Sequence, residues 1–155
     1  MIRNHILYTS FLDWKFTLKK AQGSFLWDQK GNRLIDFTSG WNVANLGWNH
    51  PEIAEAVAGQ ARRNQFVPMW LDDDIQQQYA KELTDSLPKE LTVMVRATGG
   101  TDANEKALLL ARAITGRKKI IGFNDSYHGH SYGTISIGYR AEYAQDVAPV
   151  VPEFI

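Results

Sequence analysis

The stretch ATGGTDANE, residues 97–105, joins a segment with the character of a β-strand to one with the character of a helix. The strand segment is the apolar run of residues 91–97. Beyond the glycines, residues 101–115 carry alanine and other apolar residues three or four positions apart, which predicts a helix, and Gly116 predicts its end. The stretch therefore predicts a strand, a sharp turn and a new helix N-terminus in direct succession.

Gly99 and Gly100 stand where this helix is expected to begin. The first N–H groups of a helix have no acceptor within the helix and lie at the positive end of its dipole, and glycine lets a ligand approach them closely. A phosphate bound by these N–H groups, with the hydroxyl of Thr101 as a further donor, is one interpretation of the junction. A tight turn without a ligand is the other, because the spacing matches neither the Walker phosphate loop nor GxGxxG.

A second motif, SYHG at residues 126–129, follows another short apolar run, residues 119–123. A strand, a helix and a strand in this order predict a βαβ unit in a parallel sheet, and a further short strand is expected at 134–137. The carboxyl ends of neighbouring parallel strands share one edge, so we expect Tyr127 and His128 near the glycine junction. An aromatic ring beside a bound phosphate suits a flat, phosphorylated heteroaromatic ligand. The alternative is that Tyr127 belongs to the core.

The rest of the chain carries simpler patterns. Alternating residues on either side of a polar turn at 29–32 predict a β-hairpin over residues 23–37. The stretch TSGWNVANLGWNHP, residues 38–51, has no period and indicates an irregular loop that either carries function or fills a core with its two tryptophans. Two helices are expected next, one beginning at Pro51 and one over residues 74–87.

The composition excludes several classes of function. The 155 residues include seventeen Lys+Arg and seventeen Asp+Glu, so the net charge gives no reason to expect a nucleic acid or an anionic membrane as partner. The chain has no cysteine, which excludes disulfides and thiol nucleophiles, and its four histidines show no metal-ligand spacing. No apolar run reaches the roughly 20 residues that span a bilayer. Since residues 1–16 do not have the pattern of a signal peptide, we expect a cytoplasmic protein.

Several of these stretches, taken in order, point to one family. GGTDANEKALLLAR at 99–112, TGRKKIIGF at 115–123 and SYHGHSYGTISIG at 126–138 resemble stretches of the class III pyridoxal-phosphate aminotransferases, the omega or 4-aminobutyrate type. In that family they have the forms SGTEANEAAIKLAR, KIIxF and SYHGxTxG. Residues 23–53 fit the family's entry hairpin and first active-site loop, and VAPVVPEFI at 147–155 fits the connection that follows. The resemblance therefore covers nearly the whole chain.

The resemblance implies an α/β fold that is part of a fold-type I aminotransferase. Residues 1–45 would form an N-terminal segment with a β-hairpin, part of the small domain, and residues 46–155 the first part of the large domain with its parallel sheet. That domain would bind the cofactor, pyridoxal 5′-phosphate. Two or three parallel strands leave an exposed apolar edge, so we expect this chain to be the N-terminal part of a longer protein.

The resemblance also implies which residues bind pyridoxal 5′-phosphate. Gly99, Gly100 and Thr101 would hold its phosphate, Tyr127 would stack on its pyridine ring, and His128 would pack beside that ring. The family often has serine at position 99. Gly99 therefore lacks a hydroxyl contact but keeps the main-chain cradle.

Two further positions would support the reaction, and one essential group is missing. Trp41 stands where the family has a residue of the substrate pocket, and Glu105 where it has a glutamate that supports the site from behind the cofactor-binding residues. The lysine that forms a Schiff base with the cofactor, and the acidic residue that keeps its pyridine nitrogen protonated, lie downstream of the SYHG motif in the family. No lysine here matches, so we expect no catalytic residue in this chain and no activity from it alone.

The complete protein is expected to be a transaminase that moves an amino group between an amine or amino acid and a 2-oxo acid. The alternatives are a non-catalytic, truncated product, or a class III relative with other chemistry, such as an aminomutase, a racemase or a decarboxylase. Members of the family build the active site across a dimer interface. We therefore expect a homodimer, or completion of this chain by a separate C-terminal chain.

Overall fold

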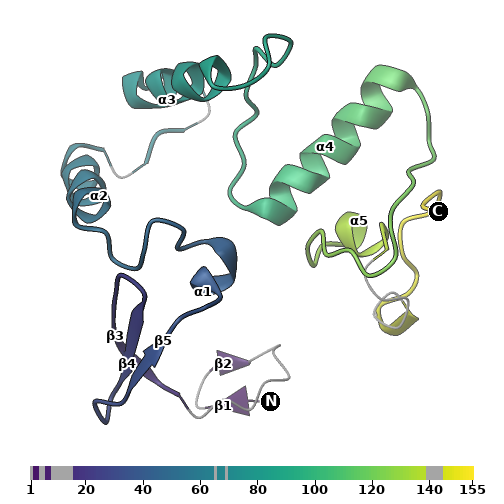
Figure 1. The fold of residues 1–155 in the computed structure, drawn as a ribbon. Helices are drawn as coiled ribbons and strands as arrows, with labels where there is room; N and C mark the ends of the chain where they lie inside the picture. The colour runs from purple at the N-terminus through teal and green to yellow at the C-terminus, as the bar shows by residue number, and fades with distance from the viewer. Residues whose placement is uncertain (1, 4–5, 8–15, 65, 69, 139–144) are drawn as a thin grey trace. The chain divides into compact units, whose positions relative to one another are not determined.

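The structure is a computed structural model that describes residues 2–3, 6–7, 16–64, 66–68, 70–138 and 145–155 (Figure 1). By its internal contacts the chain divides into two compact units, Met1–Asp72 and Asp73–Ile155. The division of domains expected from the sequence, with its boundary after residue 45, stays a prediction.

The first unit is built around a small antiparallel sheet of three strands, β3 (Leu18–Gln22), β4 (Phe25–Asp28) and β5 (Arg33–Ile35), in that order. The predicted hairpin is the β4–β5 pair. Its turn forms because the Asp28 carboxylate accepts hydrogen bonds from the main-chain N–H groups of Lys30 and Asn32, both at 2.8 Å. Strand β3, which pairs with β4, was not expected from the sequence.

The described part of this unit also contains two short strands and two helices. A separate two-stranded antiparallel sheet pairs β1 (Ile2–Arg3) with β2 (Ile6–Leu7). The loop predicted at 38–51 contains one short turn, α1 (Ser39–Asn42). Helix α2 (Pro51–Arg63) begins as predicted, with Pro51 at its first position, where a missing N–H costs no hydrogen bond.

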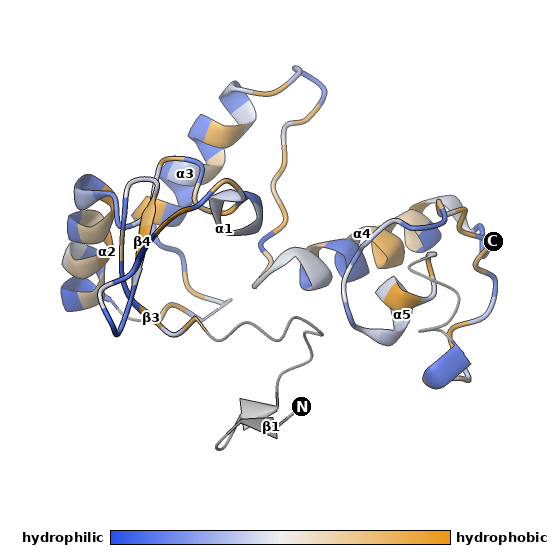
Figure 2. Cartoon of the chain, turned by 60° about the horizontal axis from the view of Figure 1, so that its bottom comes forward, coloured by the Kyte–Doolittle hydropathy of each residue, from blue (hydrophilic) through white to orange (hydrophobic). Residues whose placement is uncertain are grey.

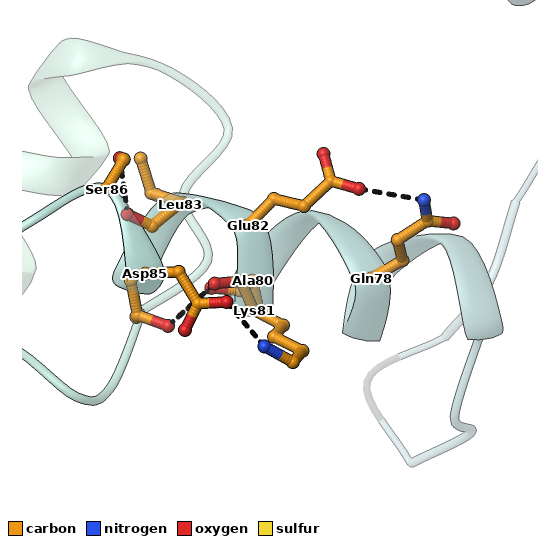
Figure 3. A network of polar contacts seen from close by, with 8 residues as sticks. Gln78, Ala80, Lys81, Glu82, Leu83, Asp85 and Ser86 are labelled. Atoms are coloured by element: carbon orange, nitrogen blue, oxygen red, sulfur yellow. Dashed lines mark hydrogen bonds and ion pairs between the residues drawn. The ribbon is translucent and has the colours of Figure 1, made fainter.

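The second unit includes the helices α3 (Asp74–Asp85), α4 (Gly100–Thr115) and α5 (Tyr132–Ile135). The Asp73 carboxylate caps α3 by accepting from the N–H groups of Ile75 and Gln76. Figure 3 shows the polar contacts that α3 makes along its own length, in which Gln78 donates to Glu82 and Lys81 pairs with Asp85, each one turn apart. Helix α4 ends at Gly116, which takes the left-handed conformation with φ +67°.

The predicted strands of this unit differ from what the structure contains. Residues 91–97 run extended between α3 and α4 but have no strand partner among the described residues (Figure 1). Residues 119–123 form one parallel bridge, Ile120 to Phe154, flanked by hydrogen bonds from Ile155 N to Ile120 O and from Gly122 N to Ile155 O, both at 2.9 Å. This bridge is parallel, but its partner is Phe154 and not the segment 91–97 that the βαβ pattern predicted as a strand of the same sheet. An apolar sequence can favour the extended conformation, but the hydrogen bonds of a β-sheet form only where a second strand lies alongside.

The strand predicted at 134–137 is wrong, because these residues belong to α5 and the turn after it. Helix α5 forms because Ser131 caps it: the Ser131 hydroxyl accepts from the N–H of Thr134, and the Thr134 hydroxyl in turn accepts from the N–H of Ser131. This reciprocal pair of local bonds outweighs the β-propensity of the isoleucines that follow.

Buried side chains concentrate where α5 meets α4. Thr134 is fully buried and Ile137 nearly so. Elsewhere many large apolar side chains are exposed, among them Val93, Ile121 and Phe123, each with roughly four-fifths of its surface accessible. Figure 2 shows apolar residues along the extended segment between α3 and α4. Among the described residues, the tight packing of the second unit is thus the contact of α4 with the loop and helix at 126–137.

No helix in the described part of the chain is both long and apolar enough to cross a bilayer.

Candidate functional site

The start of α4 has the geometry that the sequence predicted for residues 99 and 100. Gly99 is extended, with φ 174°, and the helix begins at Gly100. The first intrahelical bond runs from the N–H of Ala103 to the carbonyl of Gly99, at 3.0 Å, so the preceding amides have no acceptor within the helix. A Cβ atom added at Gly99 or Gly100 would meet nothing within 4 Å. The main chain here borders open space at the positive end of a helix dipole.

The carboxylate of Asp102, which would repel an anion, is occupied by groups of this chain. It accepts hydrogen bonds from the Thr98 N–H at 2.9 Å and from the Lys106 ammonium at 2.8 Å. The bond from Lys106, followed by that from the Thr98 N–H, lowers the pKa of Asp102 below its usual value despite an opposing effect of partial burial. Lys106 also donates to the carbonyl of Arg96, at 2.8 Å. The negative charge of Asp102 is therefore balanced beside the helix start.

The SYHG motif lies directly against this helix start. Gly129 packs on the side chain of Thr101 so closely that a Cβ at Gly129 would lie 2.9 Å from the Thr101 Cβ and Cγ2 atoms. The Asn104 side chain donates to the main-chain carbonyl of His128, at 2.8 Å. The structure thus brings together the two motifs that the sequence analysis expected to meet, residues 99–101 and 126–129. The contact depends on glycine at position 129, which has φ +132°.

Glu105 fixes the part of this loop that follows the motif. Its Oε1 atom accepts a short hydrogen bond from the Ser131 hydroxyl and a longer one, 3.3 Å, from the Thr134 N–H. Gly133 lies so near that a Cβ there would be 2.7 Å from the Glu105 Cδ atom. Glu105 therefore joins α4 to α5 one turn away from the helix start. Sequence reasoning did not single out Ser131, although Ser131 and Thr134 have the spacing of a helix cap.

Tyr127 and His128 differ in their surroundings. The Tyr127 side chain is 58% exposed, which argues against the alternative that it is a core aromatic. Its hydroxyl lies 2.9 Å from His130 Nδ1, and the two rings meet edge to face with centroids 5.1 Å apart. His128 is half-buried, and its main chain is the part bound by Asn104. The contact of His130 with Tyr127 was not predicted from the SYHG motif.

Trp41 lies in the other unit, on the short turn α1, with 88% of its surface exposed. The described residues contain no cluster of three or more histidine, aspartate or glutamate side chains that could hold a metal ion.

The comparison with known families agrees with the motifs. The family model for class III aminotransferases matches residues 10–155. The chain therefore belongs to the class III aminotransferase family, as the sequence resemblance predicted.

Curated relatives carry different substrate names. The acetylornithine aminotransferase of Methanopyrus kandleri is 35% identical over 138 residues, which make up 89% of this chain and 36% of that protein. The LysW-aminoadipate semialdehyde/glutamate semialdehyde transaminase of Sulfolobus acidocaldarius is 32% identical over 139 residues, 90% of this chain and 36% of that protein. The chain thus spans a little over a third of the length of these relatives.

Solved structures confirm the fold class. The (S)-enantioselective omega-transaminase of Thermomicrobium roseum matches 98% of this chain and 37% of its own, with a TM-score of 0.89 and 30% identity. The taurine:2-oxoglutarate aminotransferase of Bifidobacterium kashiwanohense matches 90% of this chain and 32% of its own, with a TM-score of 0.82 and 33% identity. The latter was solved in complex with PLP and glutamate, and PLP is the cofactor predicted from the sequence.

Proposed function

We propose that this chain is the cofactor-phosphate-binding part of a transaminase that moves an amino group between an amine or amino acid and a 2-oxo acid. The observation that carries the proposal is the packing of the SYHG loop on an open helix start, through Gly129 and Thr101. This packing supports the proposal because it brings residues 126–129 against the helix start, where main-chain N–H groups would bind a phosphate beside the Tyr127 ring.

The residues present fit pyridoxal 5′-phosphate. Gly99 and Gly100 border free space at the start of α4, so the main-chain N–H groups there are accessible to phosphate oxygens, and the Thr101 hydroxyl is a further donor. Tyr127, largely exposed beside this site, would stack on the pyridine ring, and His128 would pack beside it. When bound, pyridoxal 5′-phosphate supplies the electron sink for chemistry at an amino-bearing carbon.

The other predicted residues take supporting roles in this proposal. Glu105 would keep the loop around Tyr127 in place through its bonds to Ser131 and Thr134. Trp41 would contact the side chain of the amino donor. We assign no lysine of this chain to bond with the cofactor, because none matches the family's motif. Lys106, which follows the helix start, donates to the Asp102 carboxylate and to the Arg96 carbonyl.

We extend the proposal to assembly and location. The complete enzyme would be a cytoplasmic homodimer, with residues 1–45 in the small domain and residues 46–155 in the large one. Its substrates would be a small amino donor and a 2-oxo acid acceptor, a class shared by relatives whose names give different donors.

The test is a cofactor titration and a transamination assay on the complete protein that carries this chain. Replacing Thr101 by alanine should weaken binding of pyridoxal 5′-phosphate by about tenfold, the effect of losing one hydrogen bond to a charged group. The same replacement at Thr115, at the other end of α4, should leave binding unchanged. Transfer of an amino group from at least one amine to a 2-oxo acid is expected. Release of carbon dioxide or racemisation without amino transfer would contradict the proposal.

A further inference from the structure

The turn that carries Trp41 has an unusual backbone. Residues 39 to 42, the whole of α1, have positive φ angles of 51°, 57°, 65° and 64° in succession. The N–H groups of Asn42 and Val43 donate to the carbonyls of Thr38 and Ser39, at 3.0 and 2.9 Å, so the turn is closed by hydrogen bonds of its own. Right-handed turns are the default for L-residues, and only one of these four residues is glycine. Such a left-handed turn persists only where its surroundings impose it.

Asp36 supplies one part of those surroundings. Its Oδ1 atom accepts from the N–H and the hydroxyl of Thr38, at 2.8 and 2.7 Å. Its Oδ2 atom accepts from the N–H of Gly40, at 2.8 Å, and from the indole N–H of Trp48, at 2.6 Å. One carboxylate thus binds both the entry to the turn and a residue that follows it, with every acceptor site engaged by a group of this loop.

Trp48 supplies the other part. Its main chain pairs with Gly23 in both directions, at 2.9 and 2.8 Å, which attaches it to the edge of the hairpin sheet. Its ring lies against Gly40, where an added Cβ would be only 2.7 Å from the Trp48 Cζ2 atom. The turn is therefore held between the Asp36 carboxylate and the Trp48 ring, and Trp48 ties both to the sheet.

The consequence concerns Trp41, which is mostly exposed on this turn. Holding the backbone of this turn in place fixes the Cα and Cβ atoms of Trp41, and with them the point from which its ring projects. We propose that Asp36 and Trp48 are positioning residues that hold the left-handed turn. The held turn fixes where Trp41 contacts the side chain of the amino donor, and Trp41 thereby limits the size of that side chain. This inference rests on the proposed substrate role of Trp41.

The variant that tests it is Trp48→Phe, which keeps a ring against Gly40 but removes the indole N–H that Asp36 accepts. Its matched control is Trp27→Phe, the same exchange on strand β4. In the complete enzyme, Trp48→Phe should change the ratio of kcat/KM for a bulky aromatic amine over a small aliphatic amine by about five- to tenfold, mostly through KM, since one charged hydrogen bond is lost. Affinity for pyridoxal 5′-phosphate should stay within twofold, or roughly the scatter of such assays.

A second variant disturbs the same contact from the other side. Gly40→Ala places a methyl group against the Trp48 ring and should shift the substrate ratio in the same direction as Trp48→Phe. In the unmodified chain, NMR hydrogen exchange of the Trp48 indole N–H should be slow, and it should become fast in Asp36→Ala.

The outcomes separate this inference from the proposed function. An active enzyme whose substrate ratio is the same in Trp48→Phe as in Trp27→Phe would overturn the inference and leave the transaminase proposal intact. Fast exchange of the Trp48 indole N–H in the unmodified chain would overturn it as well. A complete protein that binds pyridoxal 5′-phosphate but transfers no amino group would refute the proposed function, and the inference with it.

Discussion

The contact between Gly129 and Thr101 makes a quantitative prediction, because it joins the two halves of the proposed cofactor site. In Gly129→Ala, the new methyl carbon would lie 2.9 Å from two carbon atoms of Thr101, closer than real Cβ contacts. The residue would also have to keep φ +132°, which alanine rarely adopts. Backbone strain of this kind costs about 1–3 kcal/mol, and overpacking about as much again.

The net loss expected for Gly129→Ala is about 1–6 kcal/mol of unfolding free energy, because the lower entropy of the unfolded chain offsets up to about 1 kcal/mol. Gly99→Ala is the matched control. Gly99 is extended, with φ 174°, and a Cβ there meets nothing within 4 Å, so its stability should change by less than about 0.5 kcal/mol. Binding of pyridoxal 5′-phosphate by Gly99→Ala should also change little, because serine, which carries the same Cβ atom, is often found at this position in the family.

The assay is urea unfolding followed by circular dichroism, with the cofactor titrated separately. A double variant, Thr101→Ala with Gly129→Ala, should recover part of the lost stability, about 1–2 kcal/mol, because the Oγ1 and Cγ2 atoms of Thr101 are gone and only its Cβ atom still crowds the new methyl group. Equal stability of Gly129→Ala and Gly99→Ala would refute the reasoning. So would a double variant without any recovery.

Two further predictions concern ionisable groups, namely the Asp102 carboxylate at the start of α4 and the lysines of the chain. The lowered pKa of Asp102 means that its bonds to Lys106 and Thr98 stabilise the folded state fully above pH 3.8, the ordinary value, and that this stabilisation is lost as the pH falls through the lower folded-state value. The difference in unfolding free energy between the unmodified protein and Asp102→Asn should therefore shrink below pH 4, and a difference constant from pH 6 to pH 2 would contradict it. Treating this chain with pyridoxal 5′-phosphate and then borohydride should leave no stable adduct at any single lysine, because no lysine here matches the family's Schiff-base motif. Peptide mass mapping that finds one modified site in high yield would show the opposite.

Helices and turns were the part of the fold most accessible from the sequence. Pro51 and Gly116 mark the start of α2 and the end of α4, and both are found where they were predicted. The hairpin turn between β4 and β5 was also predicted, and Asp28 and Gly31 form it. The reason is that their hydrogen bonds join residues a few positions apart, so the information that specifies them is local.

Strands were less accessible. Strand β3 was missed because its residues gain a ladder only from β4. The predicted strand at 134–137 failed because the cap formed by Ser131 and Thr134 starts a helix there. In both cases the deciding contact was not part of the apolar pattern on which the prediction rested.

In the candidate site, too, the sequence predicted some features, and others depend on contacts that only the structure shows. The motifs predicted which residues to examine, and the family comparison confirms the class of enzyme to which they belong. They did not predict the bond of Tyr127 to His130, the bond of Glu105 to Ser131, or the enclosure of the Trp41 turn by Asp36 and Trp48.

By itself, the sequence determined the family, the helices α2, α3 and α4, and the glycine junction at which α4 begins, because each depends on local spacing or on a run of matching residues. Only the tertiary structure decided that Gly129 touches Thr101, that residues 91–97 have no strand partner among those described, and that residues 39–42 turn left-handed. These features arise from contacts between residues far apart in the chain, or from strain that distant groups impose. No local pattern carries that information.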